Sequence, residues 1–115
     1  MSLLKEKFDW VKGELDSWKL TQDEKRWLLG GEGIECAIPT IEQDSKAAKN
    51  LEARFDAIHQ IKETLDAVYN GDIEAEIAWL RTEIDPFQGK SPLEFIRDSQ
   101  DPDIVSQVAR AMEGP

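Results

Sequence analysis

Residues 45–71, SKAAKNLEARFDAIHQIKETLDAVYNG, decide the fold. Apolar side chains recur there every three or four positions, which is the period of an α-helix. They are Leu51, Phe55, Ile58, Ile61, Leu65 and Val68. Asn70 and Gly71 follow, and such residues commonly end helices because they tolerate the left-handed conformation. The stretch therefore predicts a long helix that starts near Ser45 and buries one face.

Two further helices are predicted before this stretch. The first carries one apolar stripe of Leu4, Phe8, Val11, Leu15 and Trp18. Thr21-Gln22-Asp23-Glu24 is a capping box that opens the second, which Gly30 and Gly31 end. Residues 30–41 contain three glycines and Pro39, which predict a loop, and their isoleucines suggest that this loop packs onto the core.

Three more helices are predicted after the long one. Asp72 is suited to cap the first, and Asp85-Pro86 to break it. Ser91-Pro92-Leu93-Glu94 combines a serine cap, a proline at the first helical position and a glutamate at the third. Asp101-Pro102 opens the last helix. No alternating β-branched run occurs, so we expect an all-α, compact domain of about six helices.

Composition narrows the class of protein. The 115 residues are 40% hydrophobic and 33% charged, which is typical of a globular domain. The net charge of −10 opposes binding to phosphate backbones or anionic lipid and favours a basic partner. Cys36 is the only cysteine, so no intrachain disulfide can form, and we expect a cytoplasmic protein. Neither a signal peptide nor a membrane-spanning run is evident, and no membrane partner is expected.

The residues that could carry chemistry have simpler explanations. His59 is the only histidine, with no second histidine or cysteine near it to share a metal, and we interpret it as a packed or surface helix residue. We interpret Cys36 as a small buried residue. Glu74 and Glu76 are explained by the positive end of the helix dipole. Trp18, Trp27 and Trp79 are interpreted as core, whereas Trp10 lies off its helix's apolar stripe. We therefore predict no enzyme, with no catalytic, cofactor-binding or metal-ligating residues.

A series of motifs in the last third resembles a known family. They are Trp79-Leu80-Arg81-Thr82, Asp85-Pro86, Phe87-Gln88-Gly89 and Ser91-Pro92-Leu93-Glu94-Phe95-Ile96. In order and spacing they resemble the C-terminal toxin-binding domain of the Xre/MbcA/ParS antitoxins. The resemblance implies two parts: residues 1–70 as an N-terminal helical, degenerate Xre-like region, and residues 71–115 as the toxin-binding domain.

The resemblance also implies a partner. Members of the family pair with RES-domain toxins, which consume NAD, and block the active-site entrance with the antitoxin's C-terminal end. The implied partner-binding residues are Gly89, Lys90, Arg110, Ala111, Met112, Glu113, Gly114 and Pro115. A homodimer is implied as well, with the first helix and Trp10 as one candidate surface.

The N-terminal half resembles a helix-turn-helix only in part. Residues 20–30 look like its first helix, but residues 31–39 contain two glutamates and no arginine or lysine where the recognition helix should follow. Such a window cannot neutralise phosphate, so DNA binding by this degenerate motif is doubtful. Two alternatives to the antitoxin interpretation stay open: a DNA-binding regulator of the Xre type, and a protein-interaction module that kept the fold without a toxin.

Overall fold

The computed structural model describes residues 3–31, 33–83, 87, 89–99, 101 and 103–113. Over these residues the chain forms seven α-helices and no β-strand, so the all-α prediction is confirmed. The helices are α1 (Leu3–Ser17), α2 (Gln22–Leu29), α3 (Ile34–Ile41), α4 (Ser45–Tyr69), α5 (Ile73–Arg81), α6 (Pro92–Asp98) and α7 (Ile104–Glu113). The predicted break at Asp85-Pro86, together with Gln88, Gln100 and Pro102, lies outside the described residues.

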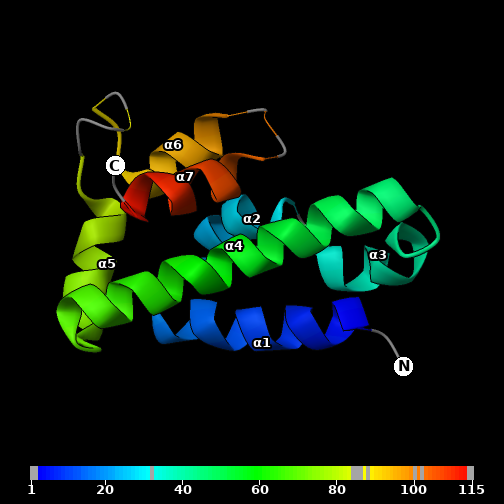
Figure 1. The fold of residues 1–115 in the computed structure, drawn as a ribbon, viewed down its shortest axis with the longest axis horizontal. Coiled ribbons are helices and arrows are strands. Elements are labelled where there is room, and N and C mark those ends of the chain that lie inside the picture. The colour runs from blue at the N-terminus through cyan, green and yellow to red at the C-terminus, as the bar shows by residue number, and fades with distance from the viewer. Residues whose placement is uncertain are drawn as a thin grey trace.

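The long helix α4 organises the other six. It crosses the whole molecule, with α1 along one side and α6 and α7 on the other (Figure 1). The short helices α3 and α5 lie near its two ends, and α2 packs against both α4 and α6. Because α4 contacts helices from both ends of the chain, the first and last thirds of the sequence are held on one scaffold.

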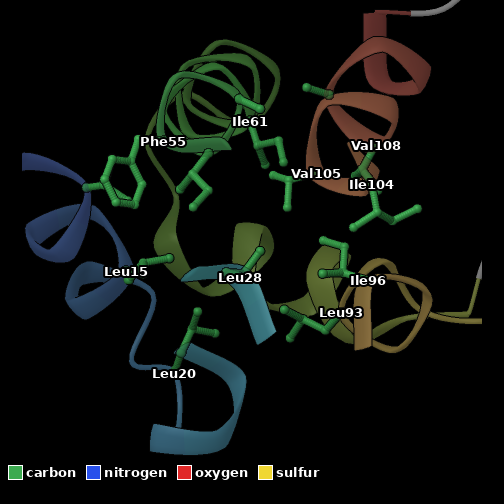
Figure 2. Close-up of a cluster of buried hydrophobic side chains, with 14 of the residues drawn as sticks. Leu15, Leu20, Leu28, Phe55, Ile61, Leu93, Ile96, Ile104, Val105 and Val108 are labelled. Carbon is green, nitrogen blue, oxygen red and sulfur yellow. The ribbon is translucent and has the colours of Figure 1, made fainter. Parts of the chain in front are cut away.

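One hydrophobic core joins all of these elements. Figure 2 shows side chains from α1, α2, α4, α6 and α7 converging on the same interior. Phe55 and Ile61 of α4 are almost fully buried there, as are Val105 and Val108 of α7. Burying a side chain of this size contributes about 1.5–3 kcal/mol relative to exposure, so this shared interior is the main source of stability.

The predicted helix caps are present. Thr21 and Ser91 each accept a hydrogen bond from the backbone amide three residues on. The side chains of Glu24 and Glu94 in turn accept hydrogen bonds from the Thr21 and Ser91 amides. Asp72 caps α5, and Asn70 ends α4 at a φ of 54° in the left-handed region. These local signals place the ends of helices correctly because each satisfies backbone groups that a helix terminus leaves unpaired.

The prediction of a loop over residues 30–41 is wrong from Ile34 onward. Gly33, at a φ of 67°, precedes α3, which continues through Pro39 to Ile41. Ile38 is 1% exposed, and Ile34 and Ile41 pack against the core from the same side of the helix. This tertiary packing outweighs the weak helix propensity of the segment, so the described helices number seven rather than about six.

Two predictions of burial are also wrong. Cys36 is exposed, because it lies two residues from both Ile34 and Ile38 and therefore points away from their face. Val68 is 63% exposed. The buried face of α4 instead continues from Leu65 to half-buried Tyr69, which is four residues further along.

The tryptophans follow their predicted placement in outline. Trp18 is fully buried, while Trp27 and Trp79 are half-buried against the core. Trp10 is 50% exposed, and its ring packs on His59 with 3.8 Å between ring centroids. His59 also contacts the carboxylates of Glu14 and Glu63, at 3.0 and 2.7 Å. It is thus a packed helix residue at the α1–α4 contact.

Glu76 is the unexpected member of the core. Its side chain is 0% exposed, and its Oε1 accepts a 3.0 Å hydrogen bond from Nε1 of Trp18. Nζ of Lys62 donates to the same oxygen at 3.2 Å and to Asp66 at 2.8 Å. Burial raises the pKa of Glu76, Asp66 raises it further, and the hydrogen bonds from Trp18 and Lys62 offset only part of this rise. The helix-dipole interpretation of this residue was therefore incomplete: Glu76 ties α5 to α4 and to the end of α1.

Replacing this carboxylate tests that role. Glu76→Ala leaves the buried Trp18 N–H without its acceptor, and we expect it to lower the free energy of unfolding by about 2 kcal/mol. Glu74→Ala is the matched control, because Glu74 is an exposed carboxylate in the same first turn. It should cost no more than about 0.5 kcal/mol. Urea denaturation followed by circular dichroism measures both; equal midpoints for the two variants would contradict the bridging role.

Candidate functional site

Three aromatic side chains pack together between α5 and α6. Phe87 is 3% exposed, and its ring contacts Trp79 at a centroid distance of 6.3 Å and Phe95 at 5.0 Å. These three rings connect the end of α5 with α6 across the segment between the two helices. Phe87 is therefore buried against both helices, whereas Gly89 lies at the surface.

Gly89 and Lys90 precede α6, with Gly89 exposed and Lys90 half-buried. Gly89 has a φ of 78°, a conformation that a side chain disfavours. The Lys90 amide donates to the Phe87 carbonyl at 3.1 Å, and its Nζ lies 3.0 Å from Oδ2 of Asp98. Lys90 therefore contacts Phe87 through its backbone and the end of α6 through its side chain.

The C-terminal part of α7 is firmly held on one side and open on the other. Val105, Val108 and Ala109 are at most 2% exposed and fix the helix against α4. Arg110 and Ala111 are exposed on the final turn, and Arg110 pairs with Asp103 at 3.0 Å. No described contact joins Arg110 to Lys90. The predicted partner-binding residues therefore form two separate parts, one before α6 at Gly89 and Lys90 and one at the end of α7.

Only part of that predicted tail can be placed. Met112 is half-buried and packs against the core. The backbone of Glu113 closes α7, but the side chain of Glu113, together with Gly114 and Pro115, lies outside the described residues.

Neither metal coordination nor membrane crossing has support in the described residues. Nowhere in the described part of the chain do three or more histidine, cysteine, aspartate or glutamate side chains gather as metal ligands. None of its helices combines the length and apolar character needed to cross a bilayer.

The model of the antitoxin Xre/MbcA/ParS C-terminal toxin-binding domain matches residues 64–114. Residues 64–114 are thus similar to the toxin-binding domain of this family. The resemblance drawn from the Trp-Leu-x-Thr and Ser-Pro-Leu-Glu motifs is thereby confirmed. Comparison with curated proteins and with solved structures gives no match.

The toxin-binding domain is joined to the first part of the chain by polar contacts as well as by the core. Arg81, at the end of α5, donates to Glu24 of α2 through Nη2 at 2.8 Å and Nε at 3.2 Å. Glu24 simultaneously completes the capping box with Thr21. A single carboxylate therefore fixes the start of α2 and its attachment to the toxin-binding domain.

Sequence reasoning missed two of the side chains that join the parts of the fold. Glu76 lies between Ile73 and Leu80 at helical spacing, so the periodicity of α5 placed it on the inner face. Arg54 lies on α4, three residues after Leu51 and four before Ile58, and is half-buried. In both cases helical spacing places the residue on the inner face of its helix, but the sequence analysis assigned only apolar residues to that face.

The Glu24–Arg81 contact makes stability depend on pH. Burial alone would raise the pKa of Glu24, but hydrogen bonds from Arg81 and from the Thr21 amide outweigh burial, and the pKa lies below its ordinary value. Stability from a lowered carboxyl pKa is present above the unfolded value of about 4.3 and is lost as pH falls through the folded pKa.

Glu24→Gln keeps a hydrogen-bonding cap but removes the charge that Arg81 meets. We expect it to cost about 1 kcal/mol at pH 7 and progressively less below about pH 4, where the native Glu24 also becomes neutral. Glu94→Gln is the matched control, since it changes the other capping box, where Arg97 is 4.0 Å away. Urea denaturation at several pH values measures both costs. A cost of Glu24→Gln that is constant from pH 7 to pH 3 would contradict this account.

Proposed function

We propose that the protein is the antitoxin of a type II toxin–antitoxin system, and that it binds and inhibits a RES-domain, NAD-consuming toxin in the cytoplasm. The family match over residues 64–114 carries this proposal, since that family is a toxin-binding domain. In the proposed division, residues 71–115 bind the toxin and residues 1–70 support them.

The geometry of α7 supports the proposed role of the tail. The helix is fixed by buried Val105 and Val108, while Arg110 and Ala111 stand exposed on its last turn. A rigid helix that ends in an exposed turn presents its final residues with little loss of conformational entropy on binding. We propose that Arg110 to Pro115 enter the toxin's active-site region, with Gly89 and Lys90 as a second contact.

The first part of the chain gives less support to operator binding. The helix that follows α2 exposes Glu35, Cys36 and Thr40, and its sequence contains no lysine or arginine. Phosphate contacts need such cations. Self-association through α1 remains part of the proposal, because Leu3 and Trp10 are exposed on that helix.

An inhibition assay tests the proposal directly. The probe is a purified RES-domain protein encoded in the same genome, and the readout is its rate of NAD consumption. We expect the full chain to suppress this rate, and a chain ending at Met112 to need at least about tenfold higher concentration, a loss of about 1.4 kcal/mol. Met112 is retained because it packs on the core, so the shorter chain should still fold.

Point variants separate tail contacts from general charge effects. Arg110→Glu reverses one exposed charge on α7, whereas Lys46→Glu makes the same change at the exposed start of α4. Only Arg110→Glu should weaken inhibition. Failure of the full chain to bind or inhibit the RES-domain protein would overturn the toxin assignment. Full inhibition by the shortened chain and by Arg110→Glu would instead overturn the role of the tail.

A further inference from the structure

A groove between α2, α4, α6 and α7 gathers three of the chain's arginines. It has a volume of about 570 Å³, and its lining includes Arg26, Arg54, Arg97, Trp27, Gly30 and Asp101. The whole protein carries a net charge of −10, so this concentration of positive charge is local. Its volume lies within the usual range of small-molecule pockets, about 300–1,000 Å³.

Arg54 is the fixed point of the groove. Its Nε donates to the Leu28 carbonyl at 2.6 Å and its Nη2 to the Trp27 carbonyl at 2.7 Å, so it caps the C-terminal end of α2. Gly30 suits this position for two reasons. A Cβ there would lie only 3.3 Å from that Nε, and its φ of 96° is a backbone conformation that residues with a side chain rarely adopt.

The capping bonds leave part of the Arg54 guanidinium unused. Its Nη1 donates to no acceptor among the described residues, and no described carboxylate pairs with it. Burial alone lowers the pKa of Arg54, with no opposing contribution from a nearby acid. A half-buried cation without an acidic partner is costly to maintain, which makes an anion from solution a favourable addition.

The two other arginines border the same space and already have partners. The guanidinium of Arg97 lies 5.4 Å from the centre of the Trp27 ring and bonds to Asp98 through Nε and Nη2. Arg26 pairs with Asp23. Asp101, the one carboxylate among the described residues of the lining, accepts hydrogen bonds from the Asp103 amide and the Gln107 side chain. Of the three arginines, Arg54 is therefore the one that no described carboxylate pairs with.

We propose that this groove binds the phosphate group of a small molecule, with Arg54 as the central donor and Arg97 at the rim. Guanidinium groups match phosphate oxygens with paired N–H donors, and Arg54 has no described carboxylate to compete with a phosphate. The acidic remainder of the protein opposes an extended polyanion such as nucleic acid, so the ligand is a compact phosphate compound.

Titration of the full chain with inorganic phosphate, with chloride adjusted to hold ionic strength constant, tests the site. The readout is the set of ¹H–¹⁵N resonances from the Arg54 and Arg97 Nε–H groups and the Gly30 and Gly31 amides. These should move with one saturating curve, and acetate under the same conditions should not saturate them. Because Arg54→Gln also removes the cap of α2, the variant to use is Arg97→Gln, which should weaken binding roughly tenfold.

Arg110→Gln is the matched control, since Arg110 is also an exposed arginine paired with an aspartate but does not line the groove. It should leave the phosphate curve unchanged. Shifts that rise without saturation, equal saturation by acetate, or equal weakening by Arg97→Gln and Arg110→Gln would each overturn the phosphate site.

Discussion

The hydrogen bond from Trp18 to the buried carboxylate of Glu76 is the contact on which the arrangement of the helices depends most. It joins the residue that follows α1 to α5, and Lys62 of α4 donates to the same carboxylate oxygen. Burial disfavours the charged form of this carboxylate, and the hydrogen bonds from Trp18 and Lys62 to Oε1 offset part of that cost. The other oxygen, Oε2, is buried with no partner among the described residues. The attachment of α5 to α4 is therefore fixed by Trp18 and Lys62, which both precede the residues that match the family.

The consequence for function is that the toxin-binding domain is supported from outside its own sequence. Its α7 packs along α4, its α6 packs on α2, and Arg81 bonds to Glu24. The exposed final turn of α7 is thus displayed on a scaffold that includes the first helices. In the proposed antitoxin, retaining these helices serves to hold the toxin-facing turn in place.

Local signals in the sequence predicted most of the fold, whereas tertiary contacts decided the exceptions. Capping boxes at Thr21 and Ser91 act within one helical turn, so they could be recognised directly. The helix over 34–41 forms because its isoleucines reach α1 and α4, which no local propensity reports. Cys36 and Glu76 illustrate the two opposite errors: a small apolar residue on an outward face, and a charged residue on an inward one. The family motifs identified the toxin-binding domain, but the tail beyond α7 could be assigned only by resemblance.

Native-state hydrogen exchange of the full chain in increasing urea is the most direct test of this shared support. The account predicts that the slowest-exchanging amides of α1, α4, α5 and α7 converge on one free energy of opening, because these helices share a core and a buried polar junction. Opening of α5 and α7 at a distinctly lower free energy, while α1 and α4 stay protected, would contradict it. The toxin-binding domain would then be a separate unit, and the Glu76–Trp18 contact would not be what holds it in place.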